Sequence, residues 1–425
     1  MRTRIALLLA VLLLMTLGSA ATAQDVSLEM WIAASPEELE AVEAQVQLFR
    51  DANPGITVTV SAQPEYDTQL QTAFAAGDYP DVFYVGQGKF VEYVEAGVLY
   101  NGNDMIENPD GLYPALRNTF TYDGSLYCPA KDFSTLAIQY NRDMFDAAGL
   151  DYPTADWTWD DLRAAAIALT NENQVGLIAN ADLDRWYAFY VQAGGHLYDE
   201  EGNFIFEADP ALQALQLYAD LHQGGYAATS ADLGAGWPGE AFGQGKGAMT
   251  LEGNWIISYL LNNFPELNWG AAEMPIGPGS AMSEEMGEMA GRGTLTFTVC
   301  LAVGANTEFP TEAWSLVNFL TGEEGAALVA ETGFGPMPSR PSAAQLYIDS
   351  FTMRAEGTGL DASTLTAFTE GGNYAVAPIM PPGFQPFRDE LNQGIQAVID
   401  GTDTAEAVVE NVAGVAQELI EEAGG

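Results

Sequence analysis

The sequence has 425 residues and a formal net charge of −45, from 59 acidic against 14 basic side chains. Such a surface repels nucleic acid and anionic lipid, so we expect no nucleic-acid partner. Hydrophobic residues make up 48% of the chain. This content excludes a disordered chain and suits two or three ordinary domains or one large two-lobed unit.

The first residues have the pattern of a secretory signal peptide. Arg2 and Arg4 precede an apolar stretch at 5–17, and Ala21-Thr22-Ala23 supplies the small residues of a cleavage site. The apolar stretch is shorter than the roughly 20 residues that a membrane span needs. We therefore expect cleavage after Ala23 and a protein of the periplasm. The cleavage point carries no cysteine, which argues against a lipid anchor.

Strands and helices alternate over the next part of the chain. Strands are predicted at 28–32, 56–60 and 81–85, separated by helices that begin at Pro36 and span 68–76. This order is typical of a parallel α/β sheet, in which ligands bind beyond the carboxyl ends of the strands. The side chains expected at those ends are Trp31, Ser35, Glu65, Tyr66, Tyr84 and Gln87.

A second α/β region is predicted after a strand at 135–140. Helices are expected at 186–193 and 210–223, and a long apolar strand is expected at 294–303. No tandem repeat or low-complexity linker separates the two regions. The sequence therefore predicts two lobes between which the chain crosses more than once.

The sequence offers little for enzymatic or metal chemistry. His196 and His222 lack ligand spacing, and two cysteines are too few for a structural zinc site. The glycine-rich stretch 242–247 lacks the spacing of a phosphate-binding loop, and no Gly-x-Ser-x-Gly elbow is present. We therefore expect no enzyme, no metal and no cofactor. A secreted carbohydrate-active enzyme stays as the alternative, because 59 acidic residues offer many carboxylate pairs.

Aromatic and polar side chains gather at predicted strand ends, helix starts and loops. An aromatic ring at the rim of a cleft can pack on the C–H face of a sugar, while carboxylates and amides bind its hydroxyls. The acidity of the chain leaves a second ligand class open, a polyamine or another cationic solute. Beyond the six side chains named above, the candidates for ligand binding are Lys131, Asp132, Asp184, Trp186, Trp237, Asn254, Trp255, Arg292, Phe384 and Arg388.

Short motifs follow one another in a fixed order along essentially the whole chain after residue 23. They include Gly-x-x-Pro-Asp-Val at 77–82, Tyr-Asn-Arg-Asp at 140–143, Trp-Thr-Trp-Asp-Asp-Leu at 157–162, Gly-x-Trp at 253–255 and Gly-x-x-Pro-x-Arg at 335–340. The ordered set resembles the family-1 extracellular solute-binding proteins of ABC importers, the carbohydrate group that includes maltose-binding protein. Each motif alone is weakly specific, whereas the complete set in this order is strongly specific.

The resemblance implies an α/β chain of the periplasmic-binding-protein type II fold, with two lobes joined by hinge strands. The N-terminal lobe would comprise 24–131 and 303–344, the C-terminal lobe would comprise 135–299 and 348–425, and the chain would cross at 132–134, 300–302 and 345–347. Cys128 and Cys300 would then lie near neighbouring crossings, which brings a disulfide between them within reach. From the sequence alone, buried free thiols are the other outcome.

The resemblance also implies a function. A monomeric receptor would close over a mono- or oligosaccharide and deliver it to the membrane permease subunits of an ABC importer. Trp255 matches the tryptophan that stacks on sugar in maltose-binding protein, and Trp31 lies on the matching end of the first strand. The loop at 85–89 and the residue Arg388 depart from the pattern of that receptor. A saccharide other than maltose is therefore expected.

Overall fold

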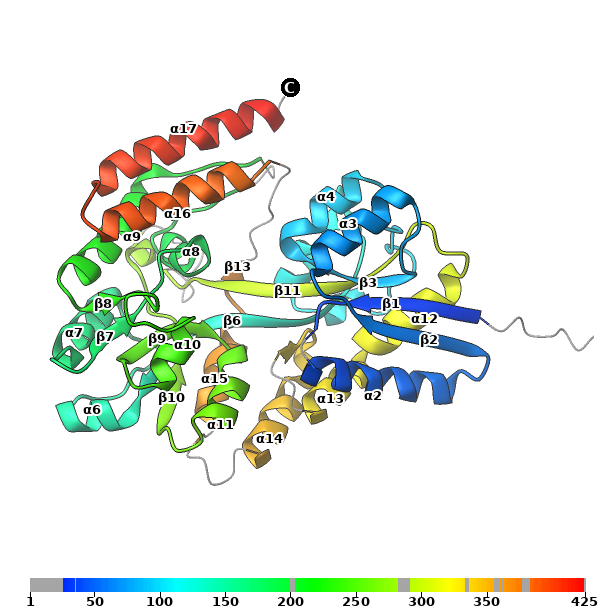
Figure 1. Cartoon of the computed structure of the whole chain (residues 1–425), viewed down its shortest axis with the longest axis horizontal. Coiled ribbons are helices and arrows are strands. Elements are labelled where there is room, and N and C mark those ends of the chain that lie inside the picture. The colour runs from blue at the N-terminus through cyan, green and yellow to red at the C-terminus, as the bar shows by residue number, and fades with distance from the viewer. Residues whose placement is uncertain are drawn as a thin grey trace, which may run out of the picture.

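The protein is described by a computed structural model that covers residues 26–34, 36–198, 203–281, 291–332, 336–354, 360, 362–376 and 383–423. The predicted signal peptide and its cleavage site lie outside the described residues. Within the described ranges, no helix is both long enough and apolar enough to span a membrane. The helices and strands form two groups, to the right and left in Figure 1, and two long strands run between them.

The first group is built around the predicted parallel sheet. The sheet order is β2-β1-β3, with β1 parallel to both neighbours. Apolar side chains alternate along β1, so that Leu28, Met30 and Ile32 are buried while Glu29 is exposed. The elements of this group are β1 (Val26–Ile32), α2 (Pro36–Ala52), β2 (Ile56–Ala62), α3 (Tyr66–Ala76), β3 (Val82–Gly86), η1 (Gln87–Lys89), α4 (Phe90–Glu95), α5 (Pro114–Thr119), β4 (Thr121–Tyr122), β5 (Ser125–Leu126), α12 (Pro310–Thr321), α13 (Glu323–Thr332) and β12 (Met337–Pro338).

The second group carries the rest of the mixed sheet, in the order β9-β7-β8, covered by helices. Its helix α7 begins at a capping box in which Thr158 and Asp161 exchange hydrogen bonds. Helices α16 and α17 pack on α9 at the outer side of this group (Figure 1). The elements are α6 (Arg142–Ala148), α7 (Trp159–Leu169), β7 (Val175–Ile178), α8 (Leu183–Gln192), α9 (Ala208–Gln223), β8 (Ala227–Ala228), α10 (Pro238–Gly243), β9 (Gly247–Gly253), α11 (Trp255–Asn263), β10 (Trp269–Ala272), α15 (Ala362–Gly371), β13 (Ala375–Val376), α16 (Gln385–Ile399) and α17 (Ala405–Ala423).

The long strands β6 (Ala130–Asn141) and β11 (Thr294–Val303) connect the groups. The first part of β6 pairs with β11 at 130–135, and its second part pairs with β9 at 136–140 and with β10 at 138–141. One strand therefore belongs to the sheets of both groups. Residues 345–347, expected as a third crossing, lie in the helix α14 (Ala344–Arg354). The predicted limits of the two lobes stay a prediction.

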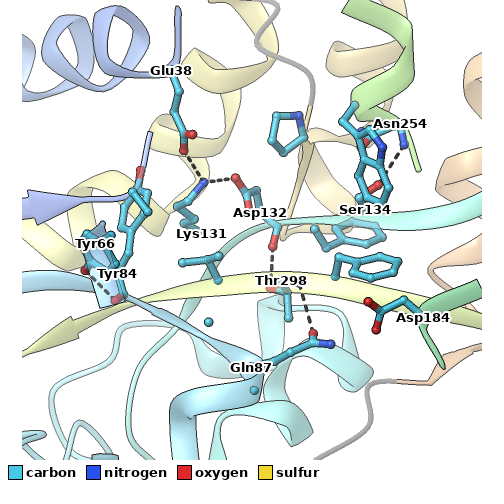
Figure 2. A pocket seen from close by; sticks show the side chains of 18 of the residues that line it. Glu38, Tyr66, Tyr84, Gln87, Lys131, Asp132, Ser134, Asp184, Asn254 and Thr298 are labelled. Atoms are coloured by element: carbon cyan, nitrogen blue, oxygen red, sulfur yellow. Dashed lines mark hydrogen bonds and ion pairs between the residues drawn. The ribbon is translucent and has the colours of Figure 1, made fainter. Parts of the chain in front are cut away.

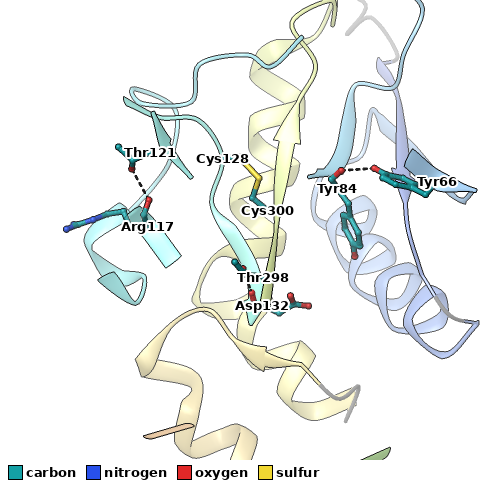
Figure 3. The surroundings of a disulfide bond; sticks show 8 residues. All are labelled: Tyr66, Tyr84, Arg117, Thr121, Cys128, Asp132, Thr298 and Cys300. Carbon is teal, nitrogen blue, oxygen red and sulfur yellow. Dashed lines mark hydrogen bonds between the residues drawn. A yellow bond between two sulfur atoms is a disulfide. The ribbon is translucent and has the colours of Figure 1, made fainter. Parts of the chain in front are cut away.

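A disulfide joins Cys128, just before β6, to Cys300 in β11 (Figure 3). Both residues are fully buried. The pairing that the sequence had left open is thus present, and it fastens the two long strands to each other where they enter the first group.

Candidate functional site

A cleft of about 500 Å³ lies between the two groups, over β6 and β11 (Figure 2). Its walls come from the ends of elements that are far apart in the sequence. The first group supplies Ala33, Glu38, Tyr66, Asp67, Tyr84, Gly86, Gln87, Gly88 and Pro336; the long strands supply Lys131, Asp132, Phe133, Ser134, Phe297, Thr298 and Val299; the second group supplies Asp184, Asn254, Trp255 and Arg388.

Lys131 is the centre of a charged cluster on the side of the first group. Its Nζ lies 3.0 Å from Oε1 of Glu38 and also contacts the carboxylate of Asp132. The same Nζ lies 4.7 Å above the centre of the Tyr84 ring, a cation–π arrangement. The side chains of Lys131 and Glu38 are 14% and 13% exposed, so this cluster is largely withdrawn from water.

Burial and pairing act against each other on these charges. Burial alone would lower the pKa of Lys131, but the neighbouring Asp132, Tyr84 and Glu38 outweigh it and raise that pKa well above its usual value. Burial raises the pKa of Asp132, which Lys131 partly opposes. At neutral pH the ammonium group is therefore firmly charged, and it balances carboxylates that would be unfavourable without it.

The wall formed by β3 and η1 is held by hydrogen bonds to the backbone. The Tyr66 hydroxyl donates to the carbonyl of Tyr84 at 2.8 Å. The backbone N–H of Thr298 donates to Oε1 of Gln87 at 3.2 Å, and the Thr298 hydroxyl donates to the carbonyl of Asp132 at 2.7 Å. Figure 2 shows this chain of contacts across the floor of the cleft. The first bond ties α3 to β3, and the other two tie η1 to β11 and β11 to β6.

Trp255 forms the aromatic wall on the side of the second group. It is the first residue of α11 and meets Phe297 edge to face, with ring centres 5.1 Å apart. Its Nε1 donates to Oε2 of Glu252 at 2.8 Å, and Glu252 is fully buried. Burial raises the pKa of Glu252, which the paired Arg185 opposes. The indole is thus partly exposed to the cleft and fixed from behind.

Amide and charged groups complete the same side. The backbone N–H of Asn254 donates to the Ser134 hydroxyl at 2.9 Å, and its side chain donates to the Tyr347 hydroxyl at 3.1 Å. Asp184, in the first turn of α8, forms an ion pair with Arg388 of α16. Asn254 and this ion pair line the same cleft as Trp255 and bring polar groups to it, as binding of a polar ligand requires.

The structure places nine of the sixteen sequence candidates in the cleft lining and six others away from it. Trp186 and Phe384 are buried in the core of the second group, at 0% and 4% exposure, and therefore cannot line the cleft. Two partly buried tryptophans lie elsewhere: Trp31 donates to Glu29, and Trp237 packs against Tyr259. The remaining candidates lie as follows: Tyr66, Tyr84, Gln87, Lys131, Asp132, Asp184, Asn254, Trp255 and Arg388 line the cleft, Glu65 is exposed at the start of α3, Arg292 pairs with Glu273, and Ser35 lies outside the described residues.

Some cleft residues were not among the sequence candidates. Phe133, Ser134, Phe297 and Thr298 come from the middle of strands, whereas the candidates were sought at strand ends and in loops. The alternation of threonines along 294–298 was the available signal, because a strand in a buried sheet has little reason to carry polar groups at every second position. Glu38 was not a candidate, because a glutamate in the first turn of a helix is already explained by the helix start.

Comparisons with known proteins agree with this fold. The sequence model of a family described as bacterial extracellular solute-binding proteins matches residues 44–356. A putative binding protein of Brucella abortus is 25% identical over 429 residues, which cover 97% of each chain. A multiple sugar-binding protein of Streptococcus mutans is 24% identical over 297 residues, covering 64% of this chain and 66% of that protein.

A solved structure extends the likeness to nearly the whole fold. The ABC substrate-binding protein of Listeria monocytogenes in complex with cycloalternan is 25% identical and superposes with a TM-score of 0.78. The superposition covers 93% of this chain and 99% of the Listeria chain.

Proposed function

The chain belongs to the bacterial extracellular solute-binding protein family, and we propose that it is the carbohydrate receptor of an ABC importer. It binds a mono- or oligosaccharide in the cleft between the two groups of elements and delivers it to membrane permease subunits. The observation that carries this proposal is Trp255, whose ring faces the cleft beside polar groups from both sides. The names of the Listeria and Streptococcus proteins support it, since one is bound to cycloalternan and the other is called a sugar-binding protein.

The surroundings of Trp255 suit a sugar because they combine an apolar ring with hydrogen-bonding groups. The ring can cover the C–H face of a pyranose. Asn254, Gln87 and Asp184 line the same cleft and carry amide and carboxylate groups that bind hydroxyls. An aromatic platform with a few polar groups around it is the usual design of a small-molecule site.

The charges in the cleft favour an uncharged ligand. Lys131 is paired with Glu38 and Asp132, and Arg388 is paired with Asp184. A polyamine would have to displace Lys131 from two carboxylates, and an anionic sugar would meet carboxylates already present. The strong negative charge of the chain is therefore assigned to its surface, and the cationic-solute alternative loses its main support.

Closure of the cleft would couple binding to delivery. The cleft walls belong to two groups joined by β6 and β11, so a ligand that contacts both walls favours the closed arrangement by its differential affinity. The chain supplies no catalytic step in this scheme, and the substrate would leave the site unchanged. We place the receptor in the periplasm as a monomer, after cleavage behind Ala23.

The test compares two tryptophans that the sequence had proposed together. A thermal-shift screen of neutral saccharides, uronic acids and spermidine identifies the ligand class, and calorimetry measures its affinity, expected near about 1 μM. Trp255→Ala should weaken binding by about a hundredfold or more, because stacking area is lost. Trp237→Ala, outside the cleft lining, should leave the affinity unchanged. Binding of spermidine alone, or release of sugar products, would contradict the proposal.

A further inference from the structure

We propose that Glu252, braced by Arg185, is a positioning residue that sets the orientation of the Trp255 indole toward the cleft. Its importance for ligand recognition rests on the proposed function, in which that indole contacts a saccharide. The orientation itself is a property of the unliganded protein and can be tested without any sugar.

Glu252 is held on all sides in the interior of the second group. It is the sixth residue of β9 (Gly247–Gly253), and its carboxylate receives both the Trp255 N–H and the Arg185 guanidinium. The Arg185 Nη2 lies 2.8 and 3.0 Å from the two carboxylate oxygens. The backbone of Glu252 is clamped by Gln139, whose side-chain amide accepts from its N–H and donates to its carbonyl, both at 2.9 Å.

Arg185 owes its own position to the start of α8. Asp182 caps that helix by accepting the Arg185 backbone N–H at 3.0 Å, and its carboxylate lies 3.6 Å from the guanidinium. The neighbouring Asp184 faces the cleft and pairs with Arg388. One helical turn therefore organises two features of the site: the ion pair that lines the cleft and, through Glu252, the indole beside it.

The rest of the environment holds the Trp255 ring in place but does not choose which edge faces inward. Gly253 leaves room for the benzo edge of the indole, since a Cβ at that position would lie 2.1 Å from Cζ3 of Trp255. Phe297 packs edge to face against the same ring. Both contacts are apolar. The N–H bond to a charged acceptor is the directional contact, and hydrogen bonds to charged groups are stronger than neutral ones.

The arrangement is chemically unusual enough to call for a role. A fully buried carboxylate is unfavourable without partners, and an apolar pair of similar size often stabilises a fold as well or better. Here the ion pair adds what an apolar pair could not, an acceptor of fixed direction for an indole at the edge of the cleft. We infer that the buried ion pair serves to fix the orientation of the Trp255 ring.

The experiment follows Trp255 by ¹⁹F NMR of the unliganded full chain labelled with 5-fluorotryptophan. The chain has 8 tryptophans, and Trp255→Phe assigns the resonance by its loss. In Glu252→Gln the amide oxygen should turn to Arg185 and its NH₂ toward the indole N–H, which breaks the bond. The Trp255 line should therefore shift and broaden. Glu273→Gln is the matched control, because Glu273 also joins an arginine and a hydroxyl, those of Arg292 and Tyr374, and its change should leave the Trp255 line unmoved.

A second variant covers the case in which Glu252→Gln does not fold, since it removes the buried carboxylate charge that pairs with Arg185. The double change Arg185→Met with Glu252→Met removes both charges and the acceptor together, and it should give the same loss of a sharp Trp255 line. A Trp255 line with unchanged shift and width in whichever of these variants folds overturns the inference.

Maltotriose and cycloalternan are then titrated as probes. For a probe that binds, Glu252→Gln should weaken affinity by about tenfold in the parent chain and not at all in Trp255→Phe. An equal loss in both backgrounds would also overturn the inference. Failure of every saccharide to bind would instead refute the proposed function, while the NMR result would still decide the orientation.

Discussion

Cys128 and Cys300 are 172 residues apart in the sequence, and their disulfide holds their Cα atoms 5.7 Å apart. Cys300 is also the residue at which β11 pairs with Val85 of β3 and, on its other side, with Ala130 of β6 (Figure 3). The covalent bond therefore secures the ends of both long strands to the sheet of the first group. We therefore propose that bending between the groups occurs farther along the strands, where Asp132, Ser134 and Thr298 line the cleft.

Removing the disulfide should lower stability without removing the site. The bond closes a long loop, so Cys128→Ala with Cys300→Ala should cost about 2–5 kcal/mol of unfolding free energy, measured by urea denaturation. Reduced wild-type protein is the control and should unfold at a similar urea concentration. Saccharide affinity should stay within about twofold, because neither cysteine lines the cleft. Equal stability of the oxidised protein and the double variant would contradict this account.

Lys131 should matter more for stability than an exposed lysine. In Lys131→Met, Glu38 and Asp132 lose their shared cation, and breaking a buried pair typically costs about 3–5 kcal/mol. Lys89→Met is the matched control. Its partner Glu92 and Lys89 itself are 48% and 39% exposed, so the change should cost under about 1 kcal/mol.

The pH dependence distinguishes the charge from the packing of Lys131. Burial already raises the pKa of Asp132 above its usual value of 3.8, and loss of Lys131 raises it further. An acid whose pKa is higher in the folded state binds its proton more readily there. The stability that this proton contributes is therefore lost as the pH rises above the pKa of the acid in the unfolded chain. Lys131→Met should therefore recover part of its lost stability as the pH falls from neutral toward the pKa of Asp132 in the unfolded chain. Identical pH profiles for wild type and variant would contradict the electrostatic explanation.

The sequence predicted the alternation of strands and helices well because apolar and polar residues repeat along each element with the period of a strand or a helix. The strand at 294–303 has the predicted limits. Periodicity says less about direction at a helix start. Asp184 and Trp186 were proposed for the same site, but two helical residues point about 200° apart. Asp184 consequently faces the cleft and Trp186 the core.

Other features of the site depend on contacts that no local pattern records. Glu38, Lys131 and Tyr84 come from α2, β6 and β3, and their cluster exists because the sheet places these elements side by side. Glu252 gave no signal either, since a glutamate in a short strand is read as exposed until its burial is known. The motifs that resemble the family include Gly-x-Trp at 253–255, whose tryptophan lines the cleft, but no motif indicates which other side chains face it.

His222 should make the fold sensitive to mild acid. Burial lowers its pKa from 6.5 to about 4, although the nearby carboxylates of Asp232 and Asp400 oppose the shift. Between these values the unfolded chain binds a proton that the folded chain does not, so stability falls as the pH drops, by up to about 3 kcal/mol near pH 4. Above about pH 6.5 the residue contributes no pH dependence.

Replacing this histidine isolates its contribution. His222→Phe keeps a ring against Tyr218, with which His222 is stacked at 5.9 Å, and removes the titrating group. The difference in unfolding free energy between wild type and His222→Phe should change with pH between about 6.5 and 4 and be flat above it. His196→Gln alters a side chain that is 68% exposed and should leave the pH profile of unfolding close to that of wild type. A pH-independent difference for His222→Phe would show that this histidine is not the sensor.

Salt should separate the acidic surface from the binding site. With a net charge of −45, the folded chain repels itself, and dissolved ions screen this repulsion. The melting temperature should therefore rise by several degrees between about 0.01 and 1 M NaCl, and chloride avoids the separate stabilising effect of sulfate. The affinity for a neutral saccharide should barely change over the same range, because an uncharged ligand forms no ion pair that salt could screen. The affinity for a cationic ligand would respond in the opposite way: if carboxylates held spermidine, its affinity would fall steadily with salt. That result would assign part of the negative charge to the binding site. A melting temperature that does not respond to salt would mean that the acidic side chains are too far apart to destabilise the fold.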